Sequence, residues 1–474
     1  MSEKNNPLVI DLDGTLIKSD LLIESFLGLI KKNPLYLFQV FFWLLQGKAV
    51  LKTEIAKRVD IDIAVLPYNN DVIKLIENEK AHGRKIVLAT ASDQKYAEAI
   101  NHHLGLFDEV LATTPFSNLA GSNKREKLIE LFGEGGFDYA GNEEKDIKVW
   151  RSANKAIVVS PDEQLRNKAA EVTTVAQHIA IPKPDLKLYL KAMRIHQWLK
   201  NALIFVPLVT AHQLFNVPLI LQAILAFFAF GLCASSVYLL NDLLDLTDDR
   251  HHKTKCNRPF AAGNIPVLQG VLLAPILLFF SIIIALFLPI NFILVLGVYY
   301  VLTTAYSFSL KKVVLIDVIM LAMLYTIRIV AGAAAIHVLP SFWLLAFSLF
   351  IFHSLAIVKR CTELRHLMAA SKEKVRGRGY DVKDLDTLYI MGIASGYISV
   401  MVLALYVNSD TVQKLYSLPE AIWLLCPIML YWISRVWILV QRDEMDDDPI
   451  VFALTDNTSR LTVALMGLVF YLAI

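Results

Sequence analysis

Long apolar runs fill the second half of the chain and restrict what it can fold into. From Leu203 to the last residue, mostly apolar stretches recur between short polar segments. A helix needs roughly 20 apolar residues to cross a bilayer, and only helices or closed barrels satisfy their backbone groups there. We therefore expect an all-α polytopic bundle of nine transmembrane helices, at approximately 202–217, 218–240, 267–288, 291–308, 314–335, 340–358, 386–407, 420–440 and 460–474.

The first part of the chain has a different character. Up to about Ile181, charged segments alternate with short β-rich runs, as in a soluble α/β domain. Two prolines one residue apart, Pro182 and Pro184, then disfavour regular structure. We predict a multidomain chain with an α/β domain at 1–180, a linker at 181–192 and a membrane domain at 193–474.

Composition narrows the functional classes. Four widely spaced cysteines indicate neither a disulfide framework nor a zinc site. The formal charge is only +2, and we expect no nucleic-acid partner. The polar start leads into a strand rather than a signal peptide, so we expect the first domain to stay in the cytosol.

Three aspartates follow the apolar run from Ile220 to Leu240. Asp242, Asp245 and Asp249 are spaced i, i+3, i+7, which would stack three carboxylates on one helical face. Their mutual repulsion calls for a hard divalent cation, and Mg²⁺ with substrate phosphates is the usual arrangement. Cationic residues that could bind a diphosphate follow at Arg250, Lys255 and Arg258. The alternative is a solvated loop whose charges only anchor the topology.

These residues resemble a known family. The pattern NDxxDxxxDR, which starts at Asn241, and the KxxRP tail resemble the first aspartate-rich motif of the UbiA superfamily of intramembrane prenyltransferases, most closely its decaprenyl-phosphate phosphoribosyltransferase branch. The resemblance implies a magnesium-dependent transferase that acts on phosphorylated substrates.

A second resemblance lies near the start of the chain. Asp11 and Asp13 end an apolar strand and, two residues apart, can converge on one pocket. They resemble the first motif of the haloacid dehalogenase superfamily, which implies a helical cap at about 20–75, a nucleophile at Asp11 and a general acid/base at Asp13. It also implies that Thr90 and Lys124 bind the phosphoryl group.

The same resemblance implies a second magnesium site, with Asp11, Asp13 and Asp146 as ligands. One position departs from the pattern: Gly141 is followed by Asn142, where the family commonly has aspartate. A retained fold without activity is the alternative reading.

The stretch from Pro34 to Leu45 lies within the expected cap. It is apolar nearly all round, too short to span a bilayer, and flanked by lysines. We expect it to rest on the bilayer surface or the membrane domain, or else to be buried in the core of the cap.

Loop charge predicts the topology. The connections near 255, 311, 370 and 445 are charged, whereas the others carry almost no lysine or arginine. The positive-inside rule then places the charged loops, every catalytic candidate and the α/β domain on the cytoplasmic side of a bacterial-type inner membrane.

Further candidates lie along the membrane domain. The segment around Trp198 resembles the RPxQWxKN entry of the phosphoribosyltransferase branch, with Ile195 in place of proline. Aromatic-ring prenyltransferases of the superfamily usually carry a second acid four residues after the first; here Leu321 follows Asp317. An arginine inside a membrane helix is costly unless it is paired, so Arg328 should face Asp317 or a substrate phosphate. The remaining candidate phosphate ligands are Lys200, Asn201, Tyr306, Lys311, Lys359, Arg360 and Arg378. For the acidic loop from Glu444 to Asp448, a lid is the one role we can suggest.

The leading hypothesis is a bifunctional membrane enzyme. It would transfer 5-phosphoribosyl from phosphoribosyl diphosphate to a polyprenyl phosphate, and its first domain would dephosphorylate the product. The alternatives are prenyl transfer from a polyprenyl diphosphate to an aromatic acceptor, and a non-catalytic lipid-binding scaffold. Homo-oligomerisation stays open.

Overall fold

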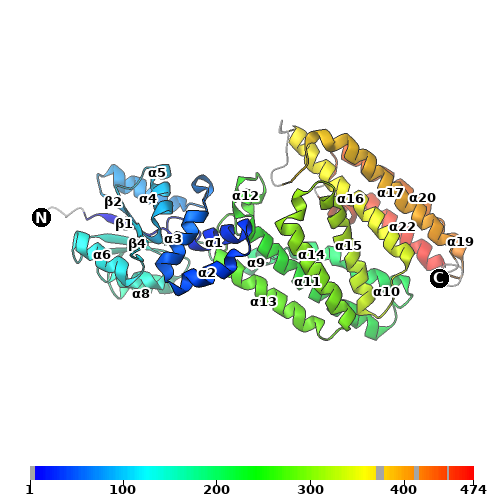
Figure 1. Cartoon of the computed structure of the whole chain (residues 1–474), viewed down its shortest axis with the longest axis horizontal. Helices are drawn as coiled ribbons and strands as arrows, with labels where there is room; N and C mark the ends of the chain where they lie inside the picture. Colours follow the sequence, from blue (N-terminus) through cyan, green and yellow to red (C-terminus); the bar gives the residue numbers. More distant parts are fainter. Residues whose placement is uncertain (1–5, 370–377, 410–415, 446–447, 474) are drawn as a thin grey trace. The chain divides into compact units, whose positions relative to one another are not determined.

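The structure is a computed structural model that describes residues 6–369, 378–409, 416–445 and 448–473. The chain divides into two compact units (Figure 1). The first unit comprises Met1–Met193 and Tyr238–Pro275, and the second comprises Arg194–Val237 and Ile276–Ile474. Each unit is described by itself.

A six-stranded sheet forms the centre of the first unit, in the order β3-β2-β1-β4-β5-β6 with every neighbouring pair parallel. Its strands are β1 (Leu8–Ile10), β2 (Ile86–Asp93), β3 (Glu109–Thr113), β4 (Asp138–Gly141), β5 (Lys155–Ser160) and β6 (Thr174–Ala180). The strand order reverses direction between β1 and β4. In open parallel sheets, ligands bind at the carboxyl ends of the strands beside such a reversal.

Helices cover both faces of this sheet (Figure 1). Leu8 and Ile10 pack with α4 (Asn70–Ala81) and α5 (Gln94–Leu104). Val9 points to the other face, which is covered by α6 (Ser122–Phe132), α7 (Ile147–Trp150) and α8 (Glu163–Ala170). Burial on both faces explains why the strands read as continuous apolar runs. The predicted α/β domain is confirmed, and the structure adds that its sheet is parallel throughout the described strands.

A helical insertion separates β1 from α4. It consists of α1 (Leu21–Lys32), α2 (Tyr36–Leu45), α3 (Lys48–Arg58) and the 3₁₀ turn η1 (Ile63–Val65). Leu29 of α1 and Ile55 of α3 belong to a small apolar core, against which Val40 and Trp43 of α2 pack. This insertion lies within the range of about 20–75 for which the family resemblance implied a helical cap.

The first unit also contains residues from the second half of the chain. These are the end of α11 (Val217–Leu244), α12 (Leu246–His251), the 3₁₀ turn η4 (Lys255–Asn257) and the start of α13 (Val267–Ala285). A short helix, α9 (Leu186–Ala192), lies within the expected linker.

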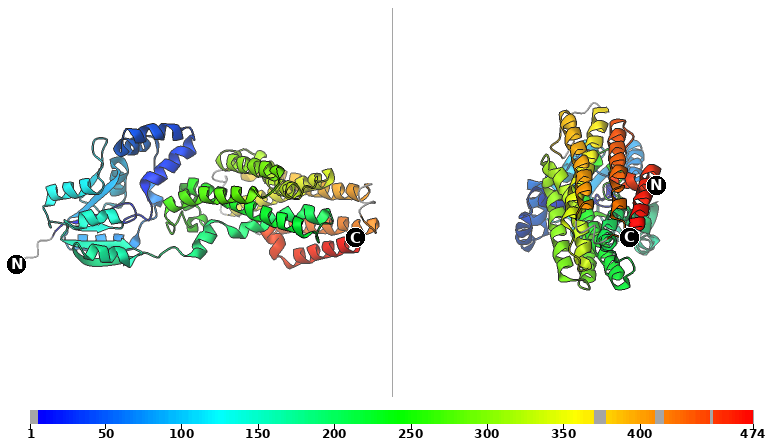
Figure 2. Two further views of the ribbon diagram at one scale, coloured as in Figure 1. Left: turned by 90° about the horizontal axis from the view of Figure 1, so that it is seen from below. Right: turned by 90° about the vertical axis from the view of Figure 1, so that its right-hand side faces the viewer.

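Long helices that lie alongside one another build the second unit (Figure 2). They are most of α11, the rest of α13, α14 (Ile290–Phe308), α15 (Ile316–Ala335), α16 (Phe342–Ala369), α17 (Leu385–Val407), α20 (Leu425–Gln441) and α22 (Asn457–Ala473). The short elements are η3 (Ile195–Phe205), α10 (Val206–Thr210), η5 (Leu310–Lys312), η6 (Val382–Asp384), α19 (Pro419–Ile422) and α21 (Pro449–Thr455).

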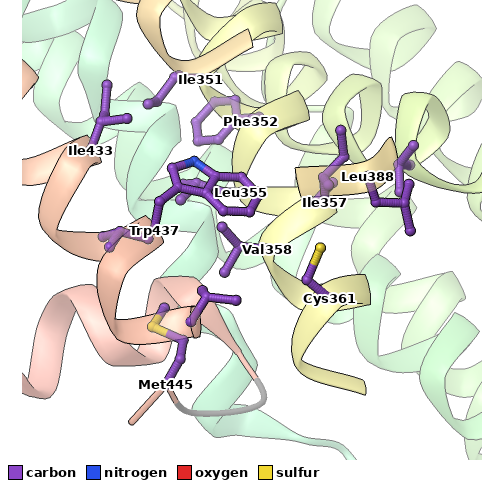
Figure 3. Close-up of a cluster of buried hydrophobic side chains, with 14 of the residues drawn as sticks. Ile351, Phe352, Leu355, Ile357, Val358, Cys361, Leu388, Ile433, Trp437 and Met445 are labelled. Atoms are coloured by element: carbon purple, nitrogen blue, oxygen red, sulfur yellow. The ribbon is translucent and has the colours of Figure 1, made fainter. Parts of the chain in front are cut away.

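The core of the second unit lies where α16, α17 and α20 meet (Figure 3). Trp437 of α20 packs among Leu355 and Val358 of α16. A Cβ on Gly392 of α17 would come within 2.3 Å of the Trp437 ring, so the helices can approach this closely only with glycine there.

Seven helices in the described residues are long and apolar enough to cross a membrane. The expected count of nine is thus not reached. Residues 202–217 fold as the end of η3 and the five-residue α10 rather than as one helix. The last expected span corresponds to α22, which has 17 residues and a length of about 26 Å.

Candidate functional site

Asp11 and Lys124 form a buried ion pair at the carboxyl end of β1. Lys124 Nζ lies 2.6 Å from Asp11 Oδ1 and also donates to the Tyr139 hydroxyl at 3.0 Å. Burial alone would lower the pKa of Lys124, but the nearby carboxylates of Asp11 and Asp146 raise it overall. Lys124 therefore brings a fixed positive charge to the end of the sheet.

Asp13 lies on the same side of the sheet. Its carboxylate accepts hydrogen bonds from Ser92 Oγ at 2.6 Å and from the Leu21 amide at 2.8 Å. Burial, followed by the charge of Asp20, raises the pKa of Asp13 to about 7. Thr90, fully buried in β2, accepts a hydrogen bond from the Ser92 amide at 2.9 Å. A carboxyl group with a pKa near neutrality can both donate and accept a proton.

Asp146 closes the loop after β4. It accepts hydrogen bonds from the Tyr139 hydroxyl and from the backbone amides of Asn142 and Glu143, at 2.9–3.0 Å. Burial and the charge of Asp11 raise the pKa of Asp146 to about 6. The sequence therefore identified an acid that lies beside Asp11.

Asn142, at the position where the haloacid dehalogenase pattern commonly has aspartate, packs against the turn after Asp13. Its side-chain oxygen accepts a hydrogen bond from Thr15 Oγ1 at 3.1 Å. Gly14 has a φ of +78°, and a Cβ there would lie 2.1 Å from Asn142 Nδ2. The absence of a side chain at Gly14 therefore leaves the space that the Asn142 side chain occupies.

Sequence reasoning missed three polar residues of this pocket. Ser92 and Tyr139 hold Asp13, Lys124 and Asp146 in place, and Lys52 Nζ donates to the Ala91 carbonyl at 2.6 Å. Ser92 lies in β2 and Tyr139 in β4, and in both segments only neighbouring residues were predicted to belong to the site. Lys52 lies on α3 and gave no signal in the sequence.

In the aspartate-rich segment, Arg258 joins two of the three predicted ligands. Its Nη1 atom lies 3.0 Å from Asp242 Oδ1 and 2.6 Å from Asp249 Oδ2. Both carboxylates are buried, and burial raises the pKa of Asp249. One positive centre, the Arg258 guanidinium, therefore lies between two carboxylates.

Asp245 does not join this pair, contrary to the expected stack of three carboxylates. The helix α11 ends at Leu244, and Asp245 adopts φ −100° and ψ 15° before α12 begins. Its carboxylate lies 2.9 Å from Lys31 Nζ of α1, which also contacts Asp248. The i, i+3, i+7 spacing assumed one unbroken helix. In the part of the chain that the structure describes, no three His, Cys, Asp or Glu side chains are placed to hold a metal ion.

Arg250 binds other groups of the protein, so its guanidinium is not exposed to bind a diphosphate. Its guanidinium forms two hydrogen bonds with Glu24 of α1, at 2.9 and 2.6 Å, and a third with the Ala261 carbonyl at 3.0 Å. His251, the next residue, lies 2.7 Å from Asp62. These contacts attach the helical insertion to the aspartate-rich segment.

In the second unit, Asp317 is surrounded by cations. The fully buried carboxylate at the start of α15 pairs with Arg360 of α16 and with Arg378, whose Nη1 atom lies 3.1 Å from Oδ1. The Tyr306 hydroxyl donates to the same oxygen at 2.7 Å. Arg360 also binds Glu363 at 2.5 Å. The four predicted residues Tyr306, Asp317, Arg360 and Arg378 do come together.

Arg328 is not paired with Asp317, which the sequence had offered as its partner. It donates to Asn201 Oδ1 at 3.0 Å, to the Tyr299 hydroxyl at 3.3 Å and to the Leu324 carbonyl. The Phe230 ring lies 5.4 Å from its guanidinium carbon. Among the described residues, the buried Nδ2 donor of Asn201 has no hydrogen-bond partner. A buried cation thus lies beside an unsatisfied donor.

Lys200 and Lys359 add positive charge to the second unit. Lys200 pairs with Asp448 and lies over the Tyr325 ring. Asp446 and Asp447 of the predicted lid lie outside the described residues, whereas Asp448 is part of this pair. Lys359 of α16 lies within electrostatic range of Lys200 and Glu363.

Three further candidates lie at helix ends. Asn241 is near the end of α11, Lys255 lies in η4 and Lys311 in η5, and all three are partly buried. Of these, Lys255 lies close enough to Asp249 for its charge to act on that carboxylate.

Comparison with known proteins identifies the family. A model described as the UbiA prenyltransferase family matches residues 202–458. Protein y4nM of Sinorhizobium fredii is 38% identical over 99% of this chain and 92% of its own length. Nodulation protein NoeC of Azorhizobium caulinodans is 34% identical over 60% of this chain and 92% of its own length. A decaprenyl-phosphate phosphoribosyltransferase of Mycolicibacterium smegmatis is 35% identical over 42% of this chain and 64% of its own length.

Among solved structures, a UbiA homologue from Archaeoglobus fulgidus bound to GPP and Mg²⁺ is 17% identical over 60% of this chain and 99% of its own, with a TM-score of 0.46. The family model covers more than half of the chain, and seven described helices are long and apolar enough to cross a membrane. The protein is therefore a multi-pass membrane protein of the UbiA prenyltransferase family.

Proposed function

We propose that the chain is a bifunctional enzyme that transfers a 5-phosphoribosyl group from phosphoribosyl diphosphate to a polyprenyl phosphate and then removes the 5-phosphate. The similarity to decaprenyl-phosphate phosphoribosyltransferases supports the first activity. The observation that carries the proposal is the arrangement around Arg328, since a buried cation beside the unsatisfied Nδ2 donor of Asn201 suits a phosphate.

The aspartate-rich segment would hold Mg²⁺ on the leaving diphosphate. Asp242 and Asp249 already share one positive centre, Arg258 Nη1, so their oxygens can serve a common cation. Carboxylate oxygens are ligands that Mg²⁺ prefers, and the ion would neutralise charge on the departing diphosphate. Arg258 would then bind the diphosphate itself, together with Lys255.

The cations of the second unit would bind phosphate groups. The positive residues Lys200, Arg328, Lys359, Arg360 and Arg378 outnumber the acids Asp317, Glu363 and Asp448 with which they lie. An excess of buried positive charge in a membrane helix bundle is costly unless an anion occupies it. Two phosphorylated substrates would meet that requirement.

Prenyl transfer to an aromatic acceptor is the second candidate, favoured by the family description. The surroundings of Asp317 argue against it. Arg360, Arg378 and Tyr306 already satisfy this carboxylate, and Leu321 stands where a second acid would be needed. A second magnesium-carboxylate cluster therefore has few ligands to build on.

The first unit would act as a phosphatase of the haloacid dehalogenase type. Asp11 would attack the phosphorus, and Asp13, with a pKa near 7, would give its proton to the departing ribose oxygen. Water would then hydrolyse the aspartyl-phosphate as Asp13 takes a proton back. Lys124 would neutralise the phosphoryl group, and Thr90 would bind it.

A magnesium ion in this pocket would find the carboxylate oxygens it prefers, although the described side chains do not place three such groups to hold a metal ion together. Asp11 and Asp146 are buried and Asp13 is partly buried; burial first, and then the charge of a neighbouring carboxylate, raises the pKa of Asp13 and of Asp146. A cation held by these groups would supply charge neutralisation during phosphoryl transfer. We further propose that this unit faces the cytoplasm of a bacterial-type inner membrane.

Isotope tracing tests both activities. Purified protein in lipid vesicles is given polyprenyl phosphate and either labelled phosphoribosyl diphosphate or labelled prenyl diphosphate. We expect label from the phosphoribosyl donor to enter the lipid and inorganic phosphate to follow. Asp242→Asn should reduce labelling of the lipid at least about 100-fold.

The variant Asp11→Asn separates the two steps. Lipid labelling should persist, whereas release of inorganic phosphate should stop. Phosphate release that persists in Asp11→Asn would refute the phosphatase, and labelling from the prenyl donor alone would refute the transferase assignment.

A further inference from the structure

Helix α2 of the first unit presents an unusually apolar outer surface. Seven large apolar side chains between residues 35 and 45 are about half or more exposed: Leu35, Leu37, Phe38, Phe41, Phe42, Leu44 and Leu45. We propose that this surface, the outer face of α2, is inserted in the lipid–water interface of the membrane that the chain spans.

The helix has two apolar faces, and only one is used within the unit. Tyr36, Val40 and Trp43, spaced i, i+4, i+7, pack against the small core formed with α1 and α3. Phe38, Phe41 and Leu45, spaced i, i+3, i+7, lie on the other side and are 60–70% exposed. Burial in the cap therefore accounts for the inner face alone.

Contacts within the first unit place α2 near the end of a membrane helix. Glu24 of α1 binds Arg250, and Lys31 at the end of α1 lies 2.9 Å from Asp245. Asp245 directly follows α11, which is long and apolar enough to cross a bilayer. Tyr36 is five residues beyond Lys31, at most roughly 18 Å of extended chain. The first residues of α2 are thus held within reach of the membrane surface.

Charge supports lipid rather than a protein partner. No acidic residue occurs between Glu24 and Glu54, whereas Lys32 and Lys48 flank the helix on its two sides. A short apolar helix with lysines at its ends is typical of segments that lie in the interface of an anionic bilayer. A permanent contact with a protein partner would not require positive charge without acidic residues.

Site-directed fluorescence quenching tests the proposal on the full chain. The background is Cys256→Ser, because Cys233, Cys361 and Cys426 are buried whereas Cys256 is partly exposed. Phe38→Cys and Phe42→Cys carry the fluorophore on α2. The matched control is Phe116→Cys, a residue of the same unit that is 97% exposed and lies in a loop after β3. All of these side chains point outward, so substitution removes little packing.

In vesicles of phosphatidylglycerol and phosphatidylethanolamine, we expect a nitroxide on the acyl chain to quench residues 38 and 42 several-fold more than residue 116. Iodide in the water should do the reverse. Strong iodide quenching at all three positions would refute the proposal. Protection of residues 38 and 42 from both quenchers would also refute it, since a protein surface would then cover α2. Neither readout depends on catalysis.

Discussion

At the scale of the residue, buried carboxylates dominate the pocket of the first unit. Asp13 has a pKa of about 7, well above its ordinary value of 3.8. Between these values the folded state binds more protons than the unfolded state, so stability is lost as the pH rises from about 4 to 7. The energetic cost at pH 8 is on the order of 4 kcal/mol. Such a cost is expected at a catalytic site and not in a purely structural core.

Asp13→Asn should therefore stabilise the first unit at pH 8 and have much less effect at pH 5. The amide removes the buried charge, and its oxygen can still accept hydrogen bonds. Pulse proteolysis of the full-length protein in urea and EDTA measures the free energy of unfolding. The exposed Asp71→Asn is the control and should show no such dependence on pH. An equal effect of Asp13→Asn at both pH values would contradict the raised pKa.

At the scale of the element, a buried ion pair and the partly exposed contact of Lys31 with Asp248 attach α1 to α12. The side chains of Glu24 and Arg250 are 5% and 4% exposed and share two hydrogen bonds. Removing one partner leaves the other charge buried and uncompensated, which costs roughly 3–5 kcal/mol. The buried pair should therefore contribute more to holding the helical insertion next to the aspartate-rich segment than the partly exposed Lys31 contacts do.

Glu24→Gln should loosen this attachment and speed hydrogen exchange of the α1 amides, while the central strands of the sheet keep their protection. The double variant Glu24→Arg with Arg250→Glu reverses the pair and should restore much of the protection. Glu54→Gln, which removes a surface pair with Lys57, is the control. If exchange in α1 is the same in all variants, the ion pair does not hold the insertion.

At the scale of the whole molecule, local patterns predicted more than distant contacts did. The two-part architecture and the UbiA family could be predicted, because strand patterning, span length and the aspartate motif are local. Asp11 and Asp13 could be expected to converge, because residues two apart at the end of a strand point the same way, and the family resemblance implied that Lys124 would join them. The position of Asp245 could not be predicted, because its partner Lys31 lies 214 residues away in the sequence. The seven helices likewise differ from the nine predicted, because residues 202–217 are apolar but not one helix, and because α22 has only 17 residues.

This distant contact links the two proposed activities. Lys31 belongs to the helical insertion of the first unit, yet it neutralises Asp245 and Asp248 of the proposed magnesium segment. Burial lowers the pKa of Lys31, but the two carboxylates raise it overall, so the lysine stays charged and competes with a metal ion. Lys31→Met should then lower the Mg²⁺ concentration needed for half-maximal phosphoribosyl transfer by about 2- to 10-fold, a modest effect because the pair is partly exposed. Lys32→Met, its neighbour, should leave that concentration unchanged. If both variants require the same Mg²⁺ concentration as the parent protein, Asp245 does not serve the metal, and the ligands are Asp242 and Asp249 alone.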